Sequence, residues 1–431
     1  MFNRSEDLTK LEIPIEQLQD GVFIELSVPW ADHPFLFNKF KIKTAKQIAI
    51  LKTLGLTHVT YIPEKSDKLP LSTQSGSVAD AATNNSSQQI DAILAQKRER
   101  IEKHKIRRKK LNECENRYQR SVGSIKNVMR NLLSRPEEAV GEAAKVVDEI
   151  VTALLDKQDF VVQLMGGKGI DENAYYHSLN VAMLSLMLGK QAGFSRESME
   201  ALGVGALLHD IGKGRVPSKI LMKKDPLNKA ELSVLRMHCQ YGREMAENIE
   251  GLPSDVLLII AHHHELNDRS GYPDGINAAT LPLSVQITTI ANTYDNLCNC
   301  MNPKLSMTPY EALSYMFKTQ KEKLNSALLA QFIRCLGIYP PGSLIKLSND
   351  MVGMVISVNS ANLLAPTVLV YDPDIPKEEA IIHDLMDDEE IKIIENIRPG
   401  ELPREIFEYL SPRTRVNYYF DTHNSSTAKP L

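Results

Sequence analysis

The sequence has no run approaching the roughly 20 apolar residues that a helix needs to cross a bilayer, so it predicts no membrane span. The first residues, MFNRSEDLTK, lack the apolar core of a secretory signal. Cysteine is scarce: five are scattered along the chain, an odd number without the spacing of a zinc ribbon. These absences favour a reduced, cytoplasmic location in which all five cysteines are thiols.

The chain also lacks a strong excess of charge of either sign. It has 50 Lys and Arg against 54 Asp and Glu, a formal net charge of −4, so we expect no binding to a nucleic-acid polymer by bulk electrostatics. Residues 97–110 (KRERIEKHKIRRKK) are locally basic. Apolar residues at helical spacing around this run favour a long solvated helix over a nucleic-acid or membrane patch.

The N-terminal third of the chain divides into three predicted segments. Residues 1–65 contain short strand-like and helix-like runs that end at glycine or proline, which predicts a small α/β domain with a sensory or interaction role. Residues 66–89 are polar, with few bulky apolar side chains to offset the entropy of ordering, and predict a flexible linker. Residues 90–136 are charged and have helical periodicity, which predicts a connecting helix.

The remainder is predicted to be mostly helical. Residues 137–330 read as successive helices separated by glycine and proline. Residues 331–410 contain short strand-like runs and predict a small β module with a tail helix, and residues 411–431 predict a polar tail. The expected fold class is therefore mainly α: an all-α helical bundle with a small C-terminal β module, preceded by a small α/β domain.

The histidines carry the most specific signal. Six of the eleven are His177, His209, His238, His262, His263 and His264. Successive sites are separated by about one helix and its connection, so each helix can bring one ring to a common centre. Asp210 follows His209 directly, and its two oxygens can bridge two cations while the imidazole binds one of them. Imidazole and carboxylate together suit iron, manganese or zinc, so the pattern predicts a metal centre inside the bundle.

A second histidine-rich segment closes another predicted helix. Adjacent helical side chains diverge by about 100°, so His262, His263 and His264 cannot all bind one ion, although two of them can serve a two-metal centre. Residues 268–275 (DRSGYPDG) follow. They are either an ordinary turn or a rigid loop that roofs the metal site.

These motifs resemble the HD-GYP branch of the HD phosphohydrolases over about residues 140–372. The residues that carry the resemblance are His177-Ser178, His209-Asp210-Ile211-Gly212-Lys213, Pro217, His238 with Gly242, His263-His264-Glu265 and Gly271-Tyr272-Pro273. The N-terminal domain also resembles an uncharacterised domain that often precedes HD-GYP domains in bacteria. The HD-GYP resemblance implies an HD-type bundle with two divalent metal ions, most often iron or manganese. It also implies a phosphodiesterase that opens a 3′,5′-cyclic dinucleotide, either cyclic di-GMP or 3′,3′-cyclic GMP-AMP, to the linear 5′-phosphorylated product in second-messenger signalling.

The resemblance also implies roles for individual residues. The metal ligands would be His177, His209, Asp210, His238, His263, His264 and Asn292. The catalytic residues would be Asp210 as the bridge between the metals, Lys213 at the phosphate and Asp295 at the attacking water. The substrate contacts would be Lys213, Arg269, Gly271, Tyr272, Pro273 and Lys304.

The sequence departs from the family pattern at a few positions. Asn292 stands where the family usually has an aspartate ligand, so one metal should be held more weakly. Asn173 stands where members with a third metal tend to have glutamate, which favours two metals. Arg269 replaces a usual glycine and is a candidate for a displaced phosphate contact. By this register His262 has no ligand role and is interpreted as structural.

Two other functions remain open from the sequence. With Asn292 in place of a charged ligand, the domain is alternatively a receptor that binds a cyclic dinucleotide without cleaving it and acts through a partner. A less favoured alternative is an HD-type hydrolase of mononucleotides or guanosine tetraphosphate. A homodimer through residues 90–133 and a protein partner for the N-terminal domain are compatible with each function.

Overall fold

The chain forms two compact units, which are described separately here. The computed structural model describes residues 9–28, 33, 35, 38–72, 86–132, 134–156, 161–165, 173–223, 225–300, 302, 305–359, 362–373, 375, 377, 380–387, 391–410 and 416–421. The first unit comprises residues 1–108 and 371–381, and the second comprises residues 109–370 and 382–431. Within the described residues, no helix combines the length and apolar character of a membrane span.

The N-terminal part of the first unit is a four-stranded antiparallel sheet with one helix. Its strands are β1 (Leu11–Pro14), β2 (Phe23–Glu25), β3 (Lys39–Lys41) and β4 (His58–Tyr61), in the order β1-β4-β2-β3, and its helix is α1 (Ala45–Thr53). Thr44 and Gln47 form a capping box that starts α1. Ile24, Ile42, Leu51 and Val59 lie in its apolar core. This is the small α/β domain that the sequence predicted.

Helix α2 (Ser86–Asn131) is one continuous helix of 46 residues. In the second unit it buries an apolar stripe that includes Tyr118, Val122 and Ile125. The Tyr118 ring stacks on Tyr176, with centroids 6.0 Å apart, and meets Tyr419 edge-on. This part of the stripe therefore packs against its own domain, as expected for an amphipathic helix.

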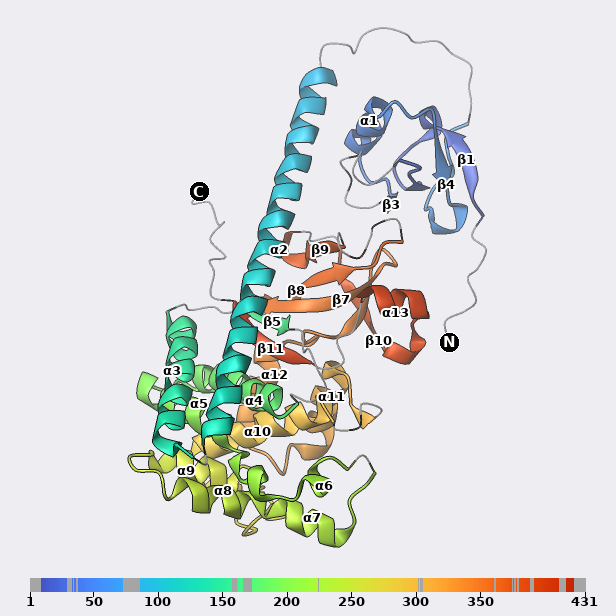
Figure 1. Cartoon of the computed structure of the whole chain (residues 1–431). Coiled ribbons are helices and arrows are strands. Elements are labelled where there is room, and N and C mark those ends of the chain that lie inside the picture. The colour runs from blue at the N-terminus through green and yellow to red at the C-terminus, as the bar shows by residue number, and fades with distance from the viewer. Residues whose placement is uncertain are drawn as a thin grey trace. The chain divides into compact units, whose positions relative to one another are not determined.

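The second unit is mainly a helical bundle (Figure 1). Its helices are α3 (Pro136–Leu155), α4 (Asn173–Gln191), α5 (Arg196–Leu208), α6 (Ser218–Leu221), α7 (Lys229–Arg236), α8 (His238–Ala246), α9 (Ser254–His262), α10 (Leu283–Cys298), α11 (Pro309–Tyr315) and α12 (Ser326–Leu336). Nearly every residue in the middle of α4 and in the first half of α10 is buried. These two helices form the centre of the bundle, which confirms the predicted mainly α fold.

The second sheet differs in part from the prediction. Its strands are β5 (Val161–Met165), β6 (Leu344–Leu347), β7 (Val352–Asn359), β8 (Asn362–Val370), β9 (Ile381–Asp384), β10 (Ile393–Ile397) and β11 (Asn417–Asp421). They pair in the order β10-β6-β7-β5-β11, with β8 pairing β7 and β9, and helix α13 (Arg404–Leu410) precedes β11. Strand β5 interrupts the segment predicted to be all helical, and β11 lies in the predicted polar tail. Both are short runs joined by long-range pairing, which local periodicity does not reveal.

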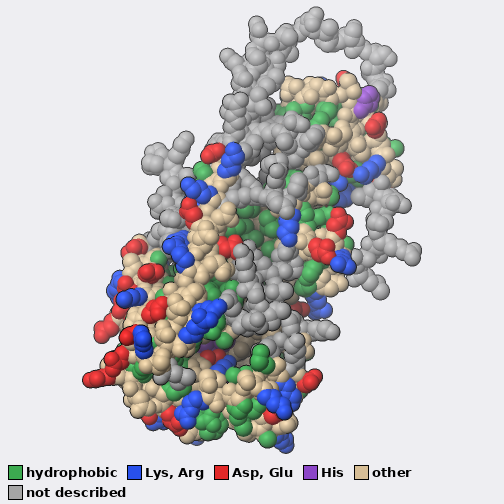
Figure 2. All heavy atoms as spheres, viewed as in Figure 1, with side chains coloured by type: hydrophobic (Ala, Val, Ile, Leu, Met, Phe, Trp, Pro, Cys, Tyr) green, Lys and Arg blue, Asp and Glu red, His purple; other side chains and the backbone are tan. Residues whose placement is uncertain are grey.

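Charged side chains of both signs are interspersed on the surface of the second unit. On the face shown in Figure 2, Lys and Arg alternate with Asp and Glu over the described helices, without a large area of one sign. On this face, the described residues form no broad basic patch of the kind that binds a nucleic-acid polymer.

Candidate metal centre

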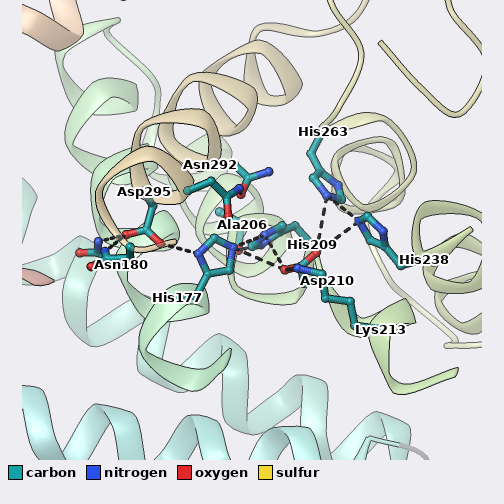
Figure 3. Close-up of polar contacts among 12 residues, drawn as sticks. His177, Asn180, Ala206, His209, Asp210, Lys213, His238, His263, Asn292 and Asp295 are labelled. Atoms are coloured by element: carbon teal, nitrogen blue, oxygen red, sulfur yellow. Dashed lines mark hydrogen bonds and ion pairs between the residues drawn. The ribbon is translucent and has the colours of Figure 1, made fainter. Parts of the chain in front are cut away.

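The ends of four helices bring the predicted ligands together (Figure 3). His177 lies within α4, and His209 caps the end of α5. His238 is the first residue of α8, and His263 caps the end of α9. Asp210 lies between α5 and the short 3₁₀ turn η4 (Ile211–Arg215). Each histidine therefore enters the same space from a different helix, as the spacing predicted.

Glycine at position 212 allows the close approach of two of these segments. A Cβ atom on Gly212 would lie 1.9 Å from the His238 carbonyl oxygen and 2.4 Å from the Gly242 nitrogen. Any larger residue would push η4 away from α8. The His-Asp-Ile-Gly sequence thus places Asp210 beside His238 because η4 and α8 pack backbone to backbone.

One oxygen of Asp210 faces the first pair of histidines. His177 Nε2 and His209 Nε2 each lie 3.4 Å from Asp210 Oδ2, and the two ring nitrogens lie 3.2 Å apart. These three residues form a group with the donor atoms of a metal site.

The other oxygen of Asp210 faces a second group. His238 Nε2 lies 3.3 Å from Asp210 Oδ1, and His263 Nε2 lies 3.8 Å from it. His264 completes this group, in which every donor atom is within 4.8 Å of the others. Although buried, Asp210 Oδ1 has no hydrogen-bond partner among the described residues. An unpaired buried carboxylate oxygen is costly unless a cation binds it, so the residues fit a pair of metal ions with Asp210 between them.

A backbone carbonyl oxygen next to Nδ1 of each of three rings determines which nitrogen carries the proton. His209 Nδ1 lies 2.7 Å from the Ala206 carbonyl oxygen, His238 Nδ1 lies 2.7 Å from that of Leu235, and His263 Nδ1 lies 3.1 Å from that of Ile259. A carbonyl oxygen only accepts, so each Nδ1 donates and each Nε2 presents a lone pair to the centre. Facing lone pairs 3.2–3.3 Å apart repel each other unless a cation lies between them. This arrangement is typical of metal-binding histidines.

The pKa values of several side chains in the site favour the protonation states in which those side chains bind a metal. Burial and neighbouring imidazoles hold the pKa of His263 and of His264 well below the usual 6.5, so both rings are neutral at pH 7. Burial alone would raise the pKa of Asp210, but the adjacent positive charge of Lys213 is the main cause that holds it well below 3.8. His263 and His264 are therefore neutral and Asp210 is ionised, which are the states in which these side chains bind a metal.

Lys213 lies beside Asp210, and its ammonium group donates a hydrogen bond to Asp210 Oδ2. Its side chain is 35% exposed, so the charge lies at the open edge of the site.

Asp295 lies on the opposite side of His177 from Asp210, which corrects its predicted role at the attacking water. His177 Nδ1 donates to Asp295 Oδ2 at 2.5 Å, and Asn180 and Asn299 donate to Asp295 Oδ1, Asn299 at 2.7 Å. The Asp295 carboxylate is buried and contacts His177 through Nδ1, on the side of the ring that faces away from Asp210. Asp295 therefore orients the His177 ring. Sequence reasoning missed Asn180, although it lies one helical turn after His177 on the same face.

Asn292 is buried on α10, one helical turn before Asn296. Its Oδ1 accepts a hydrogen bond from Asn296 Nδ2 at 2.7 Å. A ligand role for Asn292 would therefore use the remaining lone pair of an amide oxygen that carries no charge.

The predicted roof loop contacts the second histidine group through Tyr272. Its ring stacks on His264 with centroids 4.4 Å apart, and the guanidinium of Arg236 lies 4.9 Å from the Tyr272 ring centre. A Cβ atom on Gly271 would lie 2.4 Å from the His264 carbonyl oxygen, so glycine allows the loop to lie against the site. Arg236, on α7, was not predicted from the sequence.

Other predicted residues lie elsewhere. Arg269 is exposed, and within the described part of the chain no side-chain contact joins it to the histidine groups. Pro273 lines a cavity beside the loop. Lys304 lies outside the described residues, as does the side chain of Asn173. His262 does not join either histidine group around Asp210 but forms a separate group with Glu265 and Asp274.

The chain is similar in sequence to named cyclic dinucleotide phosphodiesterases. The chain is 27% identical over 361 residues to the cyclic di-GMP phosphodiesterase PA4108 of Pseudomonas aeruginosa, covering 83% of this chain and 84% of that protein. It is 34% identical over 142 residues to 3′3′-cGAMP-specific phosphodiesterase 1 of Vibrio cholerae, covering 33% of each chain. Among solved structures, Bd1817, an HDGYP protein from Bdellovibrio bacteriovorus, matches with a TM-score of 0.41 and 16% identity over 75% of this chain and 98% of that one.

Two sequence families match successive parts of the chain. Residues 10–143 match DUF3391, a domain of unknown function, and residues 127–328 match the HD domain family HD_5. The second match contains all the histidines described above. Both resemblances found in the sequence are thereby confirmed: the chain combines a DUF3391 domain with an HD domain.

Proposed function

We propose that this chain is a metal-dependent phosphodiesterase that opens a 3′,5′-cyclic dinucleotide to the linear 5′-phosphorylated dinucleotide. The observation that carries the proposal is the position of Asp210, whose Oδ2 faces His177 and His209 while Oδ1 faces His238 and His263. A carboxylate shared between two imidazole groups is the arrangement that a two-metal hydrolase needs. The named activities of the relatives, on cyclic di-GMP and 3′3′-cGAMP, support this class of substrate.

We propose that His177, His209 and Asp210 would hold one ion, and Asp210, His238, His263 and His264 the other. Iron and manganese suit this set of imidazole and carboxylate donors. When bound, such a pair activates water and neutralises charge on the phosphodiester. Asn292 is a further ligand in this proposal, and it would contribute an uncharged oxygen.

The remaining residues act on substrate and protons. Lys213, at the open edge, would offset the charge that develops on the phosphate or the leaving 3′-oxygen. Asp295 accepts the His177 Nδ1 proton and so keeps Nε2 free to bind. The Tyr272 ring, placed by Gly271 and stacked on His264, would form one wall of the substrate site, with the guanidinium of Arg236 over its face. Arg269 and Pro273 stay predicted substrate contacts.

The direct test is product chromatography. Purified protein loaded with iron or with manganese would be incubated with cyclic di-GMP and, separately, with 3′,3′-cyclic GMP-AMP. We expect linear dinucleotide from at least one of them, and none from the double variant His209→Ala/Asp210→Ala. His58→Ala, at an exposed histidine of β4, is the matched control and should retain activity. Unchanged turnover in the double variant would refute the proposal.

The receptor function is favoured by one observation. Asn292 is neutral, and its oxygen already accepts a hydrogen bond from Asn296. A site with one weakened ligand can bind the dinucleotide without cleaving it. Tight binding with no product under every metal, together with turnover in Asn292→Asp, would select the receptor function for the native chain.

We also propose a cytoplasmic location and a protein partner for the N-terminal domain. A homodimer through residues 90–133 stays a prediction. The apolar stripe around Tyr118 is buried within the chain's own second unit, so such a dimer would use other faces of α2.

A further inference from the structure

A third group of metal-type donors lies outside the site around Asp210. It consists of His262, Glu265 and Asp274, whose donor atoms all lie within 4.8 Å of one another. His262 Nδ1 lies 3.7 Å from Asp274 Oδ2. His262 is the last residue of α9, while Glu265 and Asp274 begin and end the loop that carries Tyr272. The group therefore joins a helix end to both ends of this loop.

Two buried polar atoms in this group have no hydrogen-bond partner. Glu265 is fully buried; its Oε1 accepts from the backbone nitrogens of Asp274 at 2.7 Å and Gly275 at 3.0 Å. Its Oε2 and His262 Nδ1 have no partner among the described residues. Leaving a buried carboxylate oxygen and a ring nitrogen unpaired destabilises the fold. A cation bound between them would satisfy both atoms at once.

A cavity gives access to this group from solvent. His262, Pro273 and Asp274 line a cavity of about 390 Å³ together with residues of α8, including Cys239, Arg243 and Glu244. Glu244 pairs with Arg215 at 2.6 Å and Glu247 pairs with Arg243 at 2.7 Å, so Asp274 leaves a net negative charge at the lining of the cavity. A hydrated divalent ion can therefore enter, and water can complete its coordination.

We propose that His262, Glu265 and Asp274 form a further divalent-cation site, separate from the pair around Asp210. One imidazole and two carboxylates suit Zn²⁺ or Mn²⁺. A bound ion ties the end of α9 to the loop and so restrains Tyr272 against His264. This site rests on its own donors and does not require that the chain hydrolyse a cyclic dinucleotide. It also replaces the purely structural role that the sequence analysis gave His262.

The test uses the full chain with Zn²⁺ or Mn²⁺ alone, without substrate. Metal content after dialysis and the metal-induced shift in Tm would be measured for the wild type and for Asp274→Asn and His262→Gln. We expect each variant to hold one ion fewer per chain and to lose part of the shift in Tm, with about tenfold or more weaker binding. Glu250→Gln, an exposed acid beyond α8, is the matched control and should behave as wild type.

A second comparison separates this site from the one around Asp210. His209→Ala/Asp210→Ala should keep one bound ion, and adding Asp274→Asn should remove it. If metal content and the shift in Tm are the same in Asp274→Asn and His262→Gln as in the wild type, the proposed cation site is wrong. If Asp274→Asn and His262→Gln each lose one ion but keep their turnover, the cation site is upheld whatever the substrate is.

Discussion

His177 and Asp295 lie with Nδ1 and Oδ2 2.5 Å apart, in the buried centre of the bundle. Hydrogen bonds from Asn180 and Asn299 hold the other carboxylate oxygen. Because Asp295 accepts the Nδ1 proton, the Nε2 lone pair of His177 points toward Asp210. Residues 118 positions apart thus act as one unit, a ligand and the carboxylate that orients it.

Asp295→Asn should weaken metal binding and activity together. An amide can donate to the ring as well as accept from it, so His177 would lose the constraint on its tautomer. We expect a loss of about 10- to 100-fold in metal affinity, measured by titration against a chelator, with a similar loss in kcat/KM. Asp156→Asn, at an exposed position after α3, should change neither value. Full metal affinity in Asp295→Asn would show that Asp295 does not orient the ligand.

Gly212→Ala should disrupt the site by a steric route. The added methyl group would overlap the His238 carbonyl oxygen, so η4 and α8 must separate and Asp210 must move. We expect about 1–3 kcal/mol or more of lost stability and a large loss of bound metal. Gly214→Ala is the matched control two residues further on, because a Cβ atom there meets nothing within 4 Å. Chemical denaturation with metal analysis of both variants tests this, and equal effects would contradict the packing argument.

Arg269→Gly should stabilise the protein. Arg269 has a φ of 63°, in the left-handed region, where a side chain costs about 1–2 kcal/mol and glycine does not. After the greater entropy of unfolded glycine is subtracted, we expect a net gain of about 0.5–1 kcal/mol in the free energy of unfolding. Asp350→Gly, at φ 65°, should gain less because aspartate tolerates this region. A destabilised Arg269→Gly would indicate that the arginine side chain makes a stabilising contact.

The metal-free protein should lose stability below about pH 6.5. The pKa values of His238, His263 and His264 are lowered in the fold, chiefly by burial, so the unfolded chain binds more protons as the pH falls below 6.5. His177 opposes this, because its pKa is raised: burial would lower it, but hydrogen bonds to Asp210 and Asp295 outweigh burial. The pKa of His262 is lowered as well, so with four rings against one we expect Tm in chelator to fall between pH 7 and pH 5. A flat or rising profile would contradict this balance.

The sequence predicted the ligands better than it predicted their supports. A spacing of one histidine per helix can be read from helix lengths and connections alone, so His177, His209, His238 and His263 could be assigned to a common centre before any packing was known. The place of Asp295 could not, because it depends on how α10 is rotated against α4. Strands β5 and β11 were also missed, since Val161 and Asp421 pair although they lie far apart in the sequence.

The account depends most on Asp210 as a bridge between two ions. Anomalous diffraction from crystals of the manganese-loaded protein tests this most directly. We predict two anomalous peaks beside Asp210, one in contact with Oδ2, His177 and His209, and the other with Oδ1, His238 and His263. A single peak there, or two peaks that Asp210 does not join, would contradict the account.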